Sequence, residues 1–176
     1  MKKQKGFSLI ELLIVVAIIL IIAAIAIPNL LRSKIAANES SAVGSVRTIG
    51  TAEVTYSSSW GTGYATSLGN LGGAAPCTIA KATSACLIDD LLSITQVKSG
   101  YTFNEAATKQ DTAGIWNGFE INATPTNYQT TGVRAFCDSE PGVVKFVANG
   151  AAPIGVGNNA CTTVANAPPV SGPVGN

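Results

Sequence analysis

Residues 5–31 read KGFSLIELLIVVAIILIIAAIAIPNLL and form the most apolar part of the chain. All sixteen residues from Leu12 to Ile27 are Leu, Ile, Val or Ala. At about 1.5 Å per residue, a helix from Leu9 to Ile27 is roughly 28 Å long, which matches the hydrocarbon core of a bilayer. The stretch therefore predicts a helix that requires an apolar environment.

One charged residue stands at the start of this apolar stretch. Glu11 precedes the unbroken apolar run, and no cation occurs between Lys5 and Arg32. A carboxylate in or at the edge of a membrane costs a few kcal/mol unless a cation compensates it. Cleavage of the Gly6–Phe7 bond would create an α-amine at Phe7, about one helical turn from Glu11. Either that amine or the amine of a neighbouring chain could neutralise the carboxylate.

The order of residues from Lys5 to Ile19 resembles the N-terminal signature of type IV pilins and their pseudopilin relatives. The resemblance implies that a prepilin peptidase cleaves after Gly6 and methylates Phe7. It also implies that Glu11 pairs with the N-terminal amine of an adjacent subunit during assembly. The resemblance covers roughly the first thirty residues, so it identifies an assembly machinery and leaves the task of the filament open.

The helix is expected to continue beyond the apolar stretch to about Ser57. Four apolar residues spaced by seven form a stripe along this part: Ile35, Ala42, Ile49 and Tyr56. Glu39 and Glu53 are expected to flank this stripe. Pro28 removes one backbone hydrogen bond and stands where the pilin family commonly has a helix-bending proline, so a kink or a local opening is expected there.

Beyond about residue 60 the chain is rich in Gly, Thr, Ser and Asn. Strand-like segments are residues 101–103, 116–123, 133–137 and 143–148, separated by turn signals. Residues 89–94 are expected to form a helical turn or a strand, and residues 165–176 a poorly packed end. Three or four antiparallel strands packed on the apolar stripe give an α+β fold. The resemblance implies the same pilin-like architecture, with one long N-terminal helix, half of it in the membrane, on a small antiparallel sheet.

The four cysteines predict two disulfides, since the apolar N-terminus indicates an exported domain. Three pairings are possible, and we expect the sequential one, Cys77–Cys86 and Cys137–Cys161. A metal site is the alternative interpretation, but the four positions lack the CxxC spacing of zinc sites.

The composition argues against catalysis and against nucleic-acid binding. The chain has no His, and its formal net charge is only +1. Without His and with few charges, no nucleophile–base pair or phosphate-binding loop can be assembled, so we expect no catalytic residues, no cofactor and no metal. No basic surface for nucleic acid stands out. Calcium binding is a minor alternative at Asp89–Asp90 or at Asp138 with Glu140, but no EF-hand spacing occurs.

The sequence divides into four expected parts: a leader at 1–6, a transmembrane and assembly helix at 7–31, an amphipathic second half of the helix at 32–58, and a disulfide-stapled head at 59–176. The expected function is that of a structural pilus subunit, most simply the major pilin. The prepilin would sit in the cytoplasmic membrane and then polymerise into a surface pilus, with prepilin peptidase, the assembly platform and copies of itself as partners.

Two classes of alternative remain. A type II secretion pseudopilin or a minor pilin would use the same N-terminal signature. A membrane-anchored or Sec-secreted binding domain would carry an N-terminus that only imitates it. Such a protein would be cleaved after Ala26 or left uncleaved.

Overall fold

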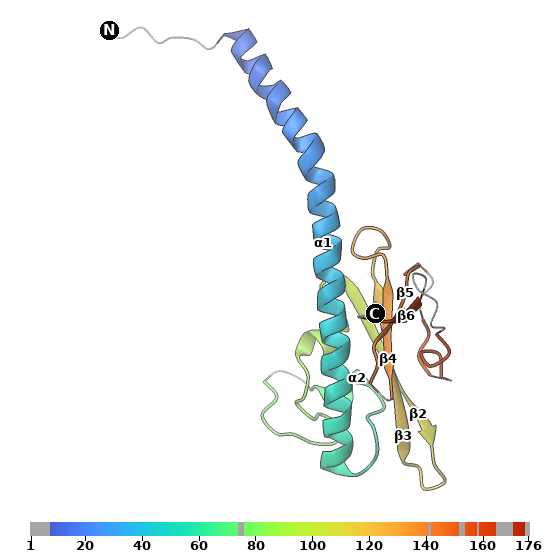
Figure 1. Ribbon diagram of the computed structural model, residues 1–176. Coiled ribbons are helices and arrows are strands. Elements are labelled where there is room, and N and C mark those ends of the chain that lie inside the picture. The colour runs from blue at the N-terminus through green and yellow to red at the C-terminus, as the bar shows by residue number, and fades with distance from the viewer. Residues whose placement is uncertain are drawn as a thin grey trace. The chain divides into compact units, whose positions relative to one another are not determined.

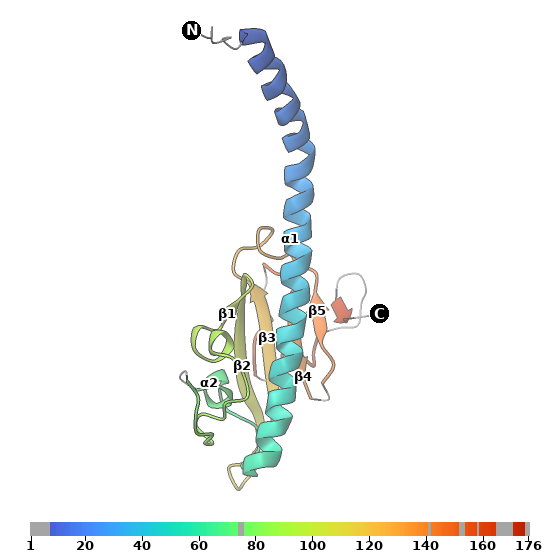
Figure 2. The ribbon, with the colours of Figure 1, turned by 90° about the vertical axis from the view of Figure 1, so that its left-hand side faces the viewer.

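The computed structural model describes residues 8–73, 76–140, 142–151, 154–157, 159–164 and 171–174. The chain forms two compact units, Met1–Lys34 and Ile35–Asn176, and the helix α1 (Leu9–Trp60) contributes to both. We call the second unit the head. The fold is α+β: a long N-terminal helix and, within the head, a six-stranded antiparallel sheet beside the second part of α1 (Figures 1 and 2).

The sheet is a meander in which every strand pairs with the strand that follows it in the sequence. Its strands are β1 (Val97–Lys98), β2 (Tyr101–Gln110), β3 (Trp116–Pro125), β4 (Ala135–Ser139), β5 (Lys145–Val147) and β6 (Ser171–Pro173). The longest pairing joins β2 to β3 from Tyr101↔Pro125 to Gln110↔Trp116. Two short helical elements, α2 (Leu68–Leu71) and η1 (Leu91–Thr95), lie between α1 and the sheet in the sequence.

The sheet has two more strands than the sequence predicted at most. β1 has two residues, and β6 has the sequence Ser-Gly-Pro, so neither carries an alternating apolar pattern. β6 pairs with β5, and both Ser171 and Gly172 are buried. The expectation of a poorly packed end was therefore wrong for residues 171–174. Backbone pairing with β5 and packing of Val174 against the core place this segment.

The core of the head lies between α1 and one face of the sheet. Ala42, Val46, Ile49 and Tyr56 recur at helical spacing and are at most 5% exposed. They share one cluster with aromatic and aliphatic residues of three strands: Tyr101, Phe103, Phe119, Ile121 and Phe136. The stripe therefore packs on the sheet as predicted, although Ile35 is only half-buried.

Glu39 belongs to this buried face and does not flank it, which corrects the sequence-based expectation. Its side chain joins α1 to the segment just before β4. One carboxylate oxygen accepts the backbone N–H groups of Val133 and Arg134 at 2.9 and 3.0 Å, and the other accepts Arg134 Nε at 2.8 Å. Three donors satisfy the buried carboxylate, so it fixes the position of β4 against α1.

Glu53 is also buried, and it faces a second carboxyl group, that of Glu105 on β2. Glu53 Oε2 accepts the backbone N–H of Ala65 at 2.9 Å. No hydrogen bond from a described N–H or O–H reaches Glu53 Oε1 or either oxygen of Glu105. Burial, followed by the proximity of Glu53, raises the pKa of Glu105 well above its usual value. We infer that the two carboxyl groups share a proton, because two buried carboxylates in contact would repel each other.

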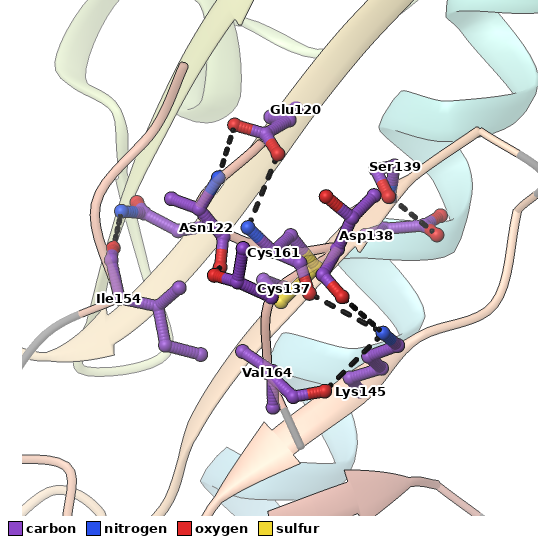
Figure 3. Close-up of a disulfide and its surroundings, with 12 residues drawn as sticks. Glu120, Asn122, Cys137, Asp138, Ser139, Lys145, Ile154, Cys161 and Val164 are labelled. Atoms are coloured by element: carbon purple, nitrogen blue, oxygen red, sulfur yellow. Dashed lines mark hydrogen bonds between the residues drawn. A yellow bond between two sulfur atoms is a disulfide. The ribbon is translucent and has the colours of Figure 1, made fainter. Parts of the chain in front are cut away.

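Two disulfides join cysteines that are neighbours in sequence order, Cys77–Cys86 and Cys137–Cys161. Figure 3 shows the second one among buried polar contacts. Glu120 on β3 accepts the backbone N–H groups of Ala160 and Cys161, each at 3.1 Å. Lys145 Nζ donates to the carbonyl oxygens of Cys161, Thr162 and Val164. The segment 159–164 is thus held by the disulfide, by Glu120 at its backbone N–H groups and by Lys145 at its carbonyl groups.

The carboxyl pair makes the stability of the head depend on pH. A group whose pKa is raised in the folded state keeps its proton where the unfolded chain releases it, so stability is present below the unfolded pKa and is lost as pH rises. For one proton the slope is about 1.4 kcal/mol per pH unit between the unfolded and folded pKa values. Glu105→Gln is expected to flatten this slope and to make the head more stable than the wild type at pH 8, in urea unfolding of the full chain in detergent.

The matched control is Glu11→Gln, which removes a carboxyl group outside the head and is expected to leave the pH profile unchanged. A Glu105→Gln variant that keeps the wild-type slope would contradict the shared proton.

Candidate functional site

The candidate site is the apolar segment of α1 from Leu9 to Leu31, whose side chains have no packing partners within the described chain. Its Leu, Ile and Val side chains are between 44% and 80% exposed. By length and composition this helix could cross a membrane, and its most apolar window is not buried. Water would otherwise contact the apolar side chains on every face of this helix segment. An apolar surface of this extent therefore requires lipid or other helices around it.

Glu11 caps the start of the helix. Ser8 precedes the first helical residue, Leu9, and Glu11 is the third residue of the helix. The backbone N–H of Ser8 donates to Glu11 Oε2 at 2.9 Å. This is the glutamate half of a capping box, in which the third helical residue binds the residue before the helix. The Ser-x-x-Glu spacing of Ser8 and Glu11 in the sequence is the signal for this cap. The sequence-based interpretation considered only the charge of Glu11.

The capping bond occupies one oxygen of the carboxylate and leaves the other available. Among the described residues, none donates a hydrogen bond to Glu11 Oε1, and the side chain is exposed. Glu11 can therefore cap the helix through Oε2 and accept a hydrogen bond from a second donor through Oε1 at the same time. Gly6 and Phe7, the expected cleavage and methylation positions, lie outside the described residues.

Pro28 lies inside α1, which passes through it without a break. Proline has no N–H, so the carbonyl four residues earlier loses its usual helical donor. At the next position, the side-chain amide of Asn29 donates to the carbonyl of Ile25 at 3.1 Å. This contact adds a side-chain bond beside the missing backbone bond. A bend at Pro28 stays a prediction.

Three of the four acidic residues considered for calcium bind other groups in the head, and for Asp90 the described contacts include no hydrogen bond or ion pair. Asp89 contacts Lys98 at 2.5 Å and accepts the backbone N–H of Leu92, and Glu140 contacts Lys109 at 3.0 Å. Asp138 is buried on β4. Over the described residues, no three His, Cys, Asp or Glu side chains gather where a metal ion could bind.

The comparisons with known proteins concern the N-terminal segment. Residues 1–27 match the family model described as the prokaryotic N-terminal methylation motif. Over 39 residues the chain is 62% identical to the type IV wide pilus major component PilA4 of Thermus thermophilus. That match covers 22% of this chain and 30% of the relative, so the chain spans about a third of the length of the curated relative that it matches. No solved structure matches the chain significantly.

The class of the segment follows from these matches and from the geometry. It matches the prokaryotic N-terminal methylation motif and continues into an apolar helix whose first turn is capped by Glu11. In this region the chain carries the type IV pilin signature, and its α+β architecture is consistent with the pilin fold.

The capping contact predicts a difference between two substitutions at one position. Glu11→Ala removes the acceptor of the Ser8 N–H, and loss of such a cap costs about 1 kcal/mol. Amide exchange in the first turn is then expected to accelerate roughly fivefold, measured by NMR on the full chain in detergent micelles. Glu11→Gln keeps an acceptor oxygen and serves as the control, with protection close to wild type. Equal protection in the wild type and in Glu11→Ala would show that the cap does not form.

Proposed function

We propose that this protein is a structural subunit of a type IV pilus, and specifically its major pilin. The observation that carries the proposal is the placement of Glu11. It is the one charge of an apolar segment that matches the methylation motif, and it keeps one oxygen outside the capping contact. A buried carboxylate without a cation is costly, so this position calls for a donor from another molecule.

The proposed assembly step begins with cleavage between Gly6 and Phe7. Hydrolysis of this bond leaves an α-amine on Phe7. The deprotonated amine takes a methyl group from a sulfonium methyl donor bound by the peptidase, and the methylated amine is protonated again in the filament. In the filament the amine of one subunit lies against Glu11 Oε1 of the next, while Oε2 keeps the Ser8 N–H. The pair is neutral as a whole, so the apolar segments can pack around it with a smaller desolvation cost than either charge alone.

The remaining parts of the chain take supporting roles in this proposal. Residues 1–6 are the leader, residues 7–31 the membrane and assembly helix, residues 32–58 the helix half that packs on the sheet, and residues 59–176 the outward-facing head. The prepilin is held in the cytoplasmic membrane and is handed to an assembly platform. Two disulfides support the head, because a crosslink reduces the entropy of the unfolded chain outside the cell.

The test compares substitutions of Glu11 by the yield of filaments sheared from cells. Glu11→Ala removes both the charge and the cap, whereas Glu11→Gln removes the charge and keeps an acceptor for Ser8. Both variants are expected to accumulate in the membrane at wild-type levels and to yield few or no filaments. The reason is that each lacks the negative charge that the neighbouring amine requires.

Filaments at wild-type yield from Glu11→Gln would contradict the assembly role of the charge and leave Glu11 as a helix cap. A wild-type chain that is cleaved but stays in the cell envelope would exclude the surface pilus and favour a pseudopilin.

A further inference from the structure

A groove of about 610 Å³ opens between α1 and the β3–β4 side of the head. Its helix wall includes Arg47, Thr51 and the half-exposed Val54, and its sheet wall includes Phe119 and Asp138. The volume lies within the range of roughly 300–1,000 Å³ that is typical of clefts with a bound group. The groove therefore combines an apolar surface with the charged side chains of Arg47 and Asp138.

Asp138 is the acceptor that this groove leaves without a donor. Its side chain is 2% exposed, and Oδ1 accepts only the backbone N–H of Ser139, at 2.9 Å. No described residue donates a hydrogen bond to Oδ2, which faces α1 at Gly50: a Cβ built there would lie 3.0 Å from it. Burial raises the pKa of Asp138 to about 6, even though the charge of Arg47 acts in the opposite direction. The carboxylate is thus incompletely compensated within its own chain.

The disulfide-closed turn between Cys77 and Cys86 presents the opposite chemistry. Backbone bonds of 2.9 Å in both directions join Lys81 and Ser84. The carbonyl of Ala82 accepts the hydroxyl of Tyr56 at 2.7 Å. The turn is therefore held rigidly, while Ile79 is 68% exposed and Lys81 is exposed. An apolar side chain and a cation project together from a fixed base.

The basic residues of the head leave Lys81 as the available cation. Lys98, Lys109 and Arg134 form ion pairs, Lys145 binds three carbonyl oxygens, and Arg47 lines the groove itself. Within the described residues no ion pair includes Lys81. Arg47 also forms no ion pair among the described residues, but it already lies in the groove with Asp138. Lys81 is thus the unpaired cation that lies outside the groove, and its charge complements a buried carboxylate whose Oδ2 accepts no hydrogen bond from a described residue.

The turn and the groove lie on different sides of the head. The residues around Cys86 bond to the backbone at residues 70–72, so the turn lies with α2. Figure 2 shows α2 and β1 on one side of α1 and β4 on the other. A projection and a hollow on different sides cannot meet within one chain, but they can meet between copies. Such a head-to-tail contact forms a closed ring if the rotation between successive copies closes. If the rotation does not close, the contact extends as a filament.

We propose that the groove receives the Ile79–Lys81 turn of a neighbouring copy of this chain, with Lys81 bound at Asp138. Ile79 contacts the apolar wall at Val54, and the ammonium group donates to Asp138 Oδ2 at the base. Glu140, whose other contact is Lys109, lies at the rim and adds negative charge. This contact rests on the proposed filament function and adds a second interface, between heads, to that of the helices.

The test is a crosslink between two kinds of subunit in one filament. Cells co-express a full-length chain with Ala80→Cys, an exposed position beside Lys81, and one with Thr51→Cys in the groove wall. Sheared filaments are oxidised, and the mixed dimer is quantified by mass spectrometry. A strong mixed dimer is expected. Adding Lys81→Gln to the first chain should reduce it about tenfold, since a hydrogen bond to a charged group is worth roughly that factor in association. Lys81→Arg should retain it.

Asp90→Cys is the control for the groove position, because Asp90 lies at the start of η1 and does not line the groove. Filaments that form but crosslink no better through Thr51→Cys than through Asp90→Cys would overturn the contact and leave the pilus function intact. A crosslink that Lys81→Gln does not weaken would also overturn it. Absence of filaments from the wild-type chain would instead overturn the proposed function.

Discussion

The apolar surface of α1 between Leu9 and Leu31 must be removed from water, and the rest of the molecule depends on that requirement. Full burial of a Leu, Ile or Val side chain stabilises by about 1.5–3 kcal/mol, so this segment represents a driving force on the order of tens of kcal/mol. Nothing in the described chain covers it. The protein therefore needs a membrane or other helices as a partner, and its head must be stable without the hydrophobic contribution of the N-terminal half of α1.

Buried acidic groups with specific partners contribute to the stability of the head. Glu39 takes backbone and guanidinium donors, Glu120 holds the segment 159–164, and Glu53 faces Glu105. Only 12% of the residues are charged, so each of these groups has a strong influence on where one segment lies. Removal of one partner would leave the other buried and unsatisfied, which makes these contacts specific as well as stabilising.

The sequence predicted the features that depend on periodicity and on short-range chemistry. Apolar residues at helical spacing predict the long helix and its stripe through Ala42 and Ile49. Alternating apolar and polar residues predict the longer strands. β6 could not be predicted, because it is set by backbone pairing with β5, which lies more than twenty residues earlier in the chain. β1 pairs with β2 across the turn at Ser99 and Gly100, but its two residues are too few to show an alternating pattern. The burial of Glu39 and Glu53 depends on which donors the sheet brings to α1, and local sequence does not contain that information. At the N-terminus, the sequence singled out Glu11 by its charge, whereas its capping contact with Ser8 needed the helix start to be located.

We propose that this chain is cut after Gly6 and polymerises through its apolar helix. Intact-mass and N-terminal analysis of filaments sheared from cells tests it most directly. We expect a chain that begins at N-methylated Phe7 and whose four cysteines are all oxidised as two disulfides. A chain that begins at Ile27, or one that retains Met1, would contradict it.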